Sequence, residues 1–489
     1  MSRKLFCAAV LCIIAGVGFA DASEQLSPEG YRKLLEAARS GNVEAQRKLA
    51  IATDNGLGVP NGAEPAAYWY QKAANAGDPM AQNEFGNMLS TGRGVARDPS
   101  AALGWFRRSA TTEFLPAQFN VAMAYITGRG TRQDFSEAAR WLRRSADAGF
   151  APSQAALALV EVMGVLGKPD CAAAEKLIAK ATRRPSGVAE YYAGAVAESG
   201  CPGGGAEQAA RWYERAAGHG NTEAMYHLAY RYSEGEGMAR DDAKALALFR
   251  KAAEMGYAKA QFSLALFYQK GRGGLPADLA QAERWYRAAA EQDFADAQVN
   301  LGSLLFRRAV SAEEQREARQ WFARAAEQGS MEGQLNLGLC LEAGYGTTRD
   351  VRTAAAWYHK AAAQGDAEAA RRLGTLLLSG EGVPRDVAEG VRQLSFAAEH
   401  GDTVAQFTLG QMYLSGESVP HDHAMAFALL TRAADGGLGS EQMTSSLRAK
   451  MSVDELNRAQ RLLAEHRFEK AVNAGPAGPA FSPINERTP

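Results

Sequence analysis

The largest apolar side chains of this 489-residue chain recur at a nearly fixed spacing. Four of the six gaps between its seven tryptophans are 36 residues long, and the other two are 71 and 73. One missing position in each long gap and two further steps after the last tryptophan complete a series of eleven positions, which we call the rungs: Trp69, Trp105, Trp141, Leu177, Trp212, Leu248, Trp285, Trp321, Trp357, Gln393 and Leu429. Periodicity of this length indicates stacked structural repeats.

The segment 98–132 shows what one repeat predicts. Asp98 can cap a helix whose first residue is Pro99, and Trp105 lies on its apolar face. This first helix should end near Glu113. A second helix should begin at Ala117 and end at the following G-R-G sequence. Two such helices joined by a short turn make an antiparallel αα-hairpin, so the pattern predicts an all-α chain of about eleven hairpins, with a half-unit before the first rung.

Small residues accompany the rungs. Alanine stands three residues before the rung in ten of the eleven repeats, aspartate stands seven before it in eight, and the second helix carries Gly or Ala at one fixed position. We interpret the rung as a buried side chain that fills the space beside the small residue. Truncating a buried tryptophan rung to alanine should then cost about 3–5 kcal/mol.

The pattern A-x-x-W-Y-x-x-A-A-x-x-G, followed by A-Q-x-x-L-G-x-x-Y-x-x-G-x-G, resembles the Sel1-like repeat, a relative of the tetratricopeptide repeat. Segments 66–94, 282–302 and 354–382 match it closely. The resemblance implies a right-handed superhelical solenoid that serves as an adaptor surface for partner proteins. The fourth and fifth repeats depart from the pattern, and so does the eighth, where 306–315 lacks the G-x-G sequence.

The chain divides into four predicted segments. Residues 1–22 have a basic start, an apolar run and an A-x-A sequence, which together predict a signal peptide and export to a bacterial periplasm or beyond. The solenoid should occupy 27–451, a capping helix opened by Ser452 and Glu455 should occupy 452–473, and the Gly- and Pro-rich 474–489 should be a disordered tail. No later stretch is apolar for long enough to predict a membrane span.

Three cysteines follow the predicted signal peptide. Cys171 stands at the start of a first helix and Cys201 just after the second helix of the same repeat, and antiparallel packing brings those ends together. A Cys171–Cys201 disulfide is therefore expected, with two free thiols as the alternative. Cys340 occupies an apolar repeat position and should be a buried thiol.

The sequence offers little chemistry. H-E-x-x-H, G-x-S-x-G and P-loop motifs are absent, and so is the S-x-x-K of serine β-lactamases, a label that some exported Sel1-like proteins carry. We therefore expect no catalytic residues, no cofactor and no enzyme activity. His421-Asp422-His423 could belong to a zinc site, but Asp422 also holds the usual helix-start position, so no metal site is predicted.

The sharpest functional hint is basic. Segment 93–144 contains nine arginines and four acidic residues in a chain of net charge −1, a balance that gives no general bias toward nucleic acid. Arg107 and Arg108 stand two and three residues after one rung, and Arg143 and Arg144 do so after the next, with Arg140 beside them. We call these five residues the arginine stripe.

Three functions follow from these observations. The leading hypothesis is an exported adaptor that binds a partner protein, with the arginine stripe as its candidate contact. The second is a cell-envelope or exopolysaccharide assembly factor in which the arginines meet an anionic polysaccharide. The third is a β-lactamase-type hydrolase, and the plain structural alternative for the stripe is a solvated charged face.

Overall fold

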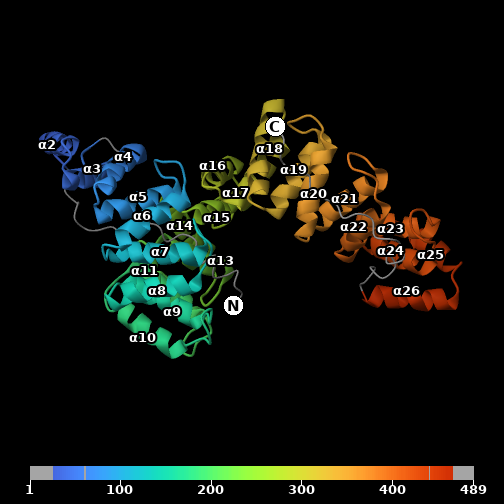
Figure 1. Cartoon of the computed structure of the whole chain (residues 1–489). Helices are drawn as coiled ribbons and strands as arrows, with labels where there is room; N and C mark the ends of the chain where they lie inside the picture. Colours follow the sequence, from blue (N-terminus) through green and yellow to red (C-terminus); the bar gives the residue numbers. More distant parts are fainter. Residues whose placement is uncertain (1–25, 60–61, 440, 466–489) are drawn as a thin grey trace. The chain divides into compact units, whose positions relative to one another are not determined.

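The computed structural model describes residues 26–59, 62–439 and 441–465, and every regular element in these ranges is an α-helix (Figure 1). Contacts divide the chain into two compact units. Unit 1 extends to Ala260 and includes Gly271–Pro276, and unit 2 comprises Gln261–Lys270 and the chain from Ala277 onward. The all-α repeat fold predicted from the sequence is confirmed.

The first and second helices of successive helix pairs alternate along the chain. In the first half they are α2 (Pro28–Arg39), α3 (Val43–Asn55), α4 (Ala63–Asn75), α5 (Pro79–Thr91), α6 (Pro99–Ala110), α7 (Leu115–Thr127), α8 (Phe135–Asp147), α9 (Ala151–Val162), α10 (Cys171–Ala181), α11 (Gly187–Ala197), α12 (Ala206–Gly218), α13 (Thr222–Glu234) and α14 (Asp242–Glu254).

The remaining helices begin with α15, which contains the boundary between the two units. They are α15 (Ala258–Lys270), α16 (Leu279–Glu291), α17 (Ala295–Arg308), α18 (Ala312–Glu327), α19 (Met331–Ala343), α20 (Val351–Ala363), α21 (Ala367–Ser379), α22 (Val387–Glu399), α23 (Thr403–Ser415), α24 (His423–Asp435), α25 (Glu441–Arg448) and α26 (Val453–Glu465).

The aspartates seven residues before the rungs act as helix caps. The Asp98 carboxylate accepts a hydrogen bond from Ala101 N at 2.9 Å at the start of α6, and the aspartates of the other seven repeats cap their helices in the same way. The turn to α7 comes earlier than predicted, because Glu113 has a φ of +63° that no helix tolerates.

The rung was misidentified as the residue that fills the space beside the small position. Trp105 is only half-buried, whereas its neighbour Phe106 is 3% exposed. A Cβ built on Gly86 of α5 would lie 2.6 Å from the Phe106 ring, so the two helices meet at a contact that only glycine permits. Tyr213, Phe322 and Tyr358, each one residue after a rung, contact glycines of the preceding helix in the same way.

α10, the first helix of the fifth helix pair, departs from the regular packing of the repeats. The sequence pattern predicted an irregular repeat in this region. This helix packs against α9 and only slightly against α11, while α9 and α11 pack directly on each other. Only Ala174 and Ala181 of α10 are fully buried. The predicted Cys171–Cys201 disulfide is present, with a Cα–Cα distance of 5.7 Å, and it joins the start of α10 to the loop after α11. Cys340 is a buried free thiol, and burial raises its pKa to about 12.

Both ends differ in part from the sequence prediction. The half-unit expected before the first rung is a complete pair, α2 and α3, which the rung series missed because the position 36 residues before Trp69 is Lys33. At the other end Ser452 and Glu455 form the predicted capping box, and α26 packs against α24. The predicted signal peptide, the end of the capping helix and the tail lie outside the described residues.

The eighth repeat has longer helices where the G-x-G sequence is missing. α17 continues to Arg308, and α18 begins after Ser311 with a capping box to Glu314. No glycine in a left-handed conformation ends α17, so its last turn continues to the short connection 309–311.

We predict that Phe106→Ala lowers the free energy of unfolding by about 3–5 kcal/mol, because it empties a fully buried position. Trp105→Ala should cost clearly less, because the tryptophan is half-exposed. Urea unfolding followed by circular dichroism measures both values. A larger loss for the Trp105 variant would contradict the assignment of the buried position.

Replacing both Cys171 and Cys201 with alanine should destabilise the region by about 3–4 kcal/mol, because α10 has few buried side chains to hold it without the disulfide. Amide hydrogen exchange should then accelerate in α10 far more than in α6 or α8. Cys340→Ala is the matched control and should leave exchange in α10 unchanged.

Candidate interaction surface

The arginine stripe lies on the two first helices α6 and α8 of unit 1. Arg107 and Arg143, two residues after their rungs, each reach the second helix of their own repeat. The Arg107 guanidinium donates to the hydroxyl of Tyr125, and Arg143 pairs with Glu161 at 3.2 Å. Only one of these two equivalent arginines therefore has an acidic partner.

Arg108 and Arg144, three residues after their rungs, lie over the rung tryptophans. The Arg108 guanidinium is 4.6 Å from the centre of the Trp105 ring, and that of Arg144 is 5.9 Å from the centre of Trp141. Arg144 also pairs with Glu113 at 3.1 Å. Arg108 has the tryptophan ring, and no acidic side chain in the described part of the chain pairs with it.

Arg140 adds little positive charge to the stripe, because a carboxylate on its own helix balances it. It pairs with Glu137 one turn earlier at 2.5 Å, and its side chain is 74% exposed. The structure thus balances Arg140, Arg143 and Arg144 with carboxylates, and it leaves the charges of Arg107 and Arg108 without a carboxylate on α6. Fewer arginines of the stripe lack a carboxylate partner than the sequence suggested. The spacing of residues along the chain does not show which acidic side chains, distant in sequence, contact these arginines.

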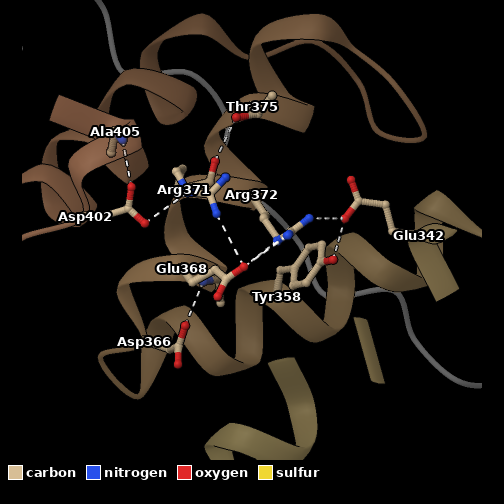
Figure 2. Close-up of polar contacts among 10 residues, drawn as sticks. Glu342, Tyr358, Asp366, Glu368, Arg371, Arg372, Thr375, Asp402 and Ala405 are labelled. Atoms are coloured by element: carbon tan, nitrogen blue, oxygen red, sulfur yellow. Dashed lines mark hydrogen bonds and ion pairs between the residues drawn. The ribbon is translucent and has the colours of Figure 1, made fainter. Parts of the chain in front are cut away.

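A polar network in unit 2 is a second candidate for a functional site (Figure 2). Arg372 of α21 pairs with Glu342 of α19 and Glu368 of its own helix, both at 3.0 Å, and Tyr358 of α20 donates to Glu342 at 2.5 Å. Burial and the hydrogen bond to Glu342 raise the pKa of Tyr358 far above its usual value.

The adjacent Arg371 extends this network to the next repeat. It pairs with Asp402 at 3.0 Å, and Asp402 in turn caps α23 by accepting from Ala405 N at 2.7 Å (Figure 2). Donors and acceptors in the network match one another across three repeats. We therefore assign it to structure, as a polar clamp between hairpins.

The His421-Asp422-His423 sequence belongs to the helix start, as predicted. Asp422 caps α24 through Met425 N at 3.1 Å and pairs with Arg458 of α26 at 2.7 Å. His423 contacts Glu455 of the same helix at 3.2 Å. Within the described part of the chain, no group of three His, Cys, Asp or Glu side chains is arranged to hold a metal ion.

Two titratable side chains of α13 in unit 1 have strongly shifted pKa values, and sequence reasoning missed both. Glu223 is 4% exposed and its Oε1 has no hydrogen-bond partner, so burial raises its pKa to about 7. The His227 ring stacks on Tyr213 with centres 5.2 Å apart, and burial lowers its pKa to about 3, with Lys259 and Arg231 adding to the effect. His227 is therefore neutral at neutral pH, whereas the Glu223 carboxyl stays protonated up to a pH well above the usual range of a glutamate.

Comparison with known proteins identifies the repeat. The model of the Sel1 repeat matches ten segments, which are 43–78, 79–111, 115–150, 189–221, 222–257, 258–294, 295–330, 332–366, 367–402 and 403–438. Residues 151–188 fall between two matches, and this stretch contains α10.

Among solved structures, c5321 is similar over nearly the whole chain. It is a protective antigen present in uropathogenic Escherichia coli strains and displays an SLR fold, with 28% identity, coverage of 89% of this chain and 94% of that chain, and a TM-score of 0.57. A Sel1 repeat protein from Oxalobacter formigenes is 33% identical over 42% of this chain and 85% of its own, with a TM-score of 0.40.

A curated relative is chitin synthase regulatory factor 3 of Schizosaccharomyces pombe. It is 34% identical over 96 residues, which are 19% of this chain and 10% of that protein. The chain thus spans only a tenth of this relative's length. No helix in the described ranges has the length and apolar character needed to cross a membrane.

The pKa of Glu223 predicts a pH-dependent stability. Because its pKa rises from 4.5 to about 7 on folding, its contribution is fully favourable below pH 4.5 and is lost as the pH rises through 7. Glu223→Gln should be more stable than the wild type at pH 8 by up to about 3 kcal/mol, with no difference at pH 4.

Urea unfolding of both proteins at each pH tests this expectation. Comparing the variant with the wild type at one pH cancels the opposite effect of His227, whose contribution is present above pH 6.5 and lost as the pH falls toward 3. An equal difference at both pH values would show that Glu223 does not titrate as described.

Proposed function

The chain belongs to the Sel1 repeat family, and from this premise we propose that it is an exported scaffold that binds an acidic segment of a partner protein at the arginine stripe. Sel1 repeat proteins generally act as protein-interaction scaffolds, and a solenoid of this kind is typically non-catalytic. The fold alone does not choose a surface or a partner, so the choice depends on the side chains.

The observation that carries the proposal is the pair Arg107 and Arg108. Their guanidinium groups lie on Tyr125 and over Trp105, and among the residues that the structure describes no carboxylate pairs with them. An arginine held on an aromatic ring keeps its outer N–H donors in a fixed plane, which suits two-pronged binding of a carboxylate.

The neighbouring ion pairs can exchange partners. Arg144 is 50% exposed and its partner Glu113 is 77% exposed, so their pairing contributes little free energy in water. A carboxylate from a bound segment can replace Glu113 at small cost. The stripe then offers up to four guanidinium groups to one acidic chain.

Export is supported by two observations. Residues 1–22 carry the signal-peptide pattern, and the Cys171–Cys201 disulfide suits an oxidising compartment such as the periplasm or the exterior. We place the protein there, outside the reach of cytoplasmic nucleic acid.

A second candidate keeps the same arginines but exchanges the ligand. An anionic polysaccharide would also present carboxylates at regular intervals, and tryptophan rings suit sugar faces, as expected of a cell-envelope or exopolysaccharide assembly factor. Trp105 and Trp141 are already covered by Arg108 and Arg144, which favours the protein segment. Nothing in the geometry favours the β-lactamase-type hydrolase, and steady turnover of a chromogenic cephalosporin would revive it.

We expect poly-L-glutamate to bind the purified protein more tightly than polygalacturonate, and more weakly as salt rises. Changing Arg107, Arg108, Arg143 and Arg144 to Glu should lower the affinity for poly-L-glutamate by more than about tenfold. Fluorescence anisotropy of the labelled polymers measures this.

The matched control changes four other exposed basic residues of unit 1 to Glu: Lys33, Lys48, Arg211 and Lys244. Each of them pairs with an acidic side chain three or four residues earlier in the sequence. This variant has the same net charge and should bind nearly as the wild type does. Tighter binding of polygalacturonate would support the second candidate, and equal losses in both variants would remove the stripe as the site.

A further inference from the structure

The irregular helix α10 carries a second group of basic side chains, outside the ten segments that match the Sel1 repeat. The stretch 168–184 contains five basic and two acidic residues. One of the two acids, Asp170, caps α10 by accepting from Ala173 N at 2.9 Å. The basic residues are all exposed, and they are Lys168, Lys176, Lys180, Arg183 and Arg184.

These five bases have no partners, in contrast to the bases of the flanking first helices. Every arginine of α8 and of α12 pairs with a carboxylate, as Arg143 does with Glu161 at 3.2 Å and Arg215 with Glu190 at 2.9 Å. In the part of the chain that the structure describes, no carboxylate pairs with any base of 168–184, and none of these bases lies over an aromatic ring. Their charges are therefore available to another molecule.

The way in which α10 is attached leaves one side of it exposed. α8 buries five side chains, whereas α10 buries only Ala174 and Ala181. α10 packs against α9 and only slightly against α11. The Cys171–Cys201 disulfide joins the start of α10 to the loop after α11, where packing is scarce. The disulfide therefore anchors α10 without covering its outer side.

The exposed side of α10 has no bulky side chain at its centre. Its exposed residues are Ala172, Glu175, Lys176, Ala179 and Lys180. With 3.6 residues per turn, these five positions span about 140° of the helix circumference. The two alanines lie in the middle of this arc, with both lysines on one side of them and the single acid on the other. A flat surface can therefore approach the helix closely.

Apolar side chains lie beside the bases in the sequence. Leu166, in the connection before α10 and two residues from Lys168, is 37% exposed. Leu177 and Ile178, which follow Lys176, are half-buried. Bases accompanied by accessible apolar side chains are typical of segments that lie on the surface of a bilayer.

The chemistry of these bases differs from that of the arginine stripe. Three of the five are lysines, which are strongly hydrated point charges on flexible stems. In the stripe, by contrast, the Arg108 guanidinium is held over the Trp105 ring, which favours two-pronged binding of one carboxylate. Bases without such support suit a surface over which negative charge is spread, such as the phosphates of a bilayer.

We propose that residues 166–184 form a second interaction surface, which binds a bilayer containing anionic phospholipids. The five bases are attracted to the lipid phosphates, and Leu166 contacts the boundary of the acyl chains. The contact is peripheral and uses none of the residues of the arginine stripe. The protein can therefore bind an acidic partner with the stripe while α10 holds it on a membrane surface.

Cosedimentation of the full-length protein with lipid vesicles tests this surface. We expect binding to vesicles of equimolar phosphatidylcholine and phosphatidylglycerol, little binding to pure phosphatidylcholine, and weaker binding as salt rises. Changing Lys176, Lys180, Arg183 and Arg184 to Glu should lower the affinity for the anionic vesicles by more than about tenfold. The unfolding midpoint should stay unchanged, because all four side chains are exposed.

The matched control is the variant in which the four stripe arginines are changed to Glu, because it has the same net charge. It should bind anionic vesicles nearly as the wild type does, and the α10 variant should still bind poly-L-glutamate. Leu166→Ser keeps every charge and should weaken vesicle binding roughly threefold. It tests the same surface if the charge-reversal variant does not fold.

Three results would overturn the membrane surface: no binding of the wild type to anionic vesicles, equal binding to pure phosphatidylcholine, or equal losses in the α10 and stripe variants. An α10 variant that keeps vesicle binding but loses poly-L-glutamate would assign these bases to an acidic protein segment instead. Failure of the wild type to bind poly-L-glutamate would overturn the proposed function alone, since vesicle binding does not depend on it.

Discussion

The structure depends on one close approach, between the aromatic or leucine side chain that follows ten of the eleven rungs and a small residue on the helix before it. In six repeats this small residue is a glycine, and a Cβ there would lie 2.5 to 3.0 Å from the facing side chain or backbone. A large ring pressed on a bare backbone fixes both the distance and the orientation of two helices. Because this contact joins one hairpin to the next, it sets the spacing of the repeats, and the caps and polar clamps refine a stack already made.

The sequence was sufficient to predict the fold because its repeat is long and because the rungs, the helix-start aspartates and the small residues recur at constant distances from one another. It failed where a contact is not periodic. Tryptophan marks the repeat clearly to the eye, but the side chain that packs against Gly86 is its neighbour Phe106, since a helix turns by 100° between them. α2 and α3 escaped notice because their pair lacks a rung. α10 was recognised as irregular, yet its withdrawal from between α9 and α11 depends on tertiary packing that no local pattern encodes.

The candidate surface could be predicted only in outline. Spacing placed Arg107 and Arg108 at the positions that Arg143 and Arg144 hold in the next repeat, and the structure keeps that equivalence. It did not reveal that Glu113 and Glu161 balance two of these charges, because their contacts join residues 31 and 18 apart, from the turn before α7 to α8 and from α9 to α8. The glutamine position was visible within the A-Q motif, but whether its oxygen is matched depends on a residue about 30 positions later in another hairpin. Ion pairing and hydrogen-bond completeness are properties of pairs of repeats.

This pairwise character also explains how one repeated architecture can carry a specific site. Most positions of a repeat are constrained by the packing of its own helices, so they vary little and have little capacity to distinguish one partner from another. Positions that face the adjacent repeat across the short turn are less constrained. In unit 2 they are filled with side chains that complete each other's hydrogen bonds, from Gln292 to the clamp around Arg372, and such a surface has little left to offer a ligand. In unit 1 the corresponding positions hold Ala76, Thr112 and Ala148, whose side chains are too short to complete the hydrogen bonds of the neighbouring glutamines, so the repeats of this unit are less fully bonded to one another.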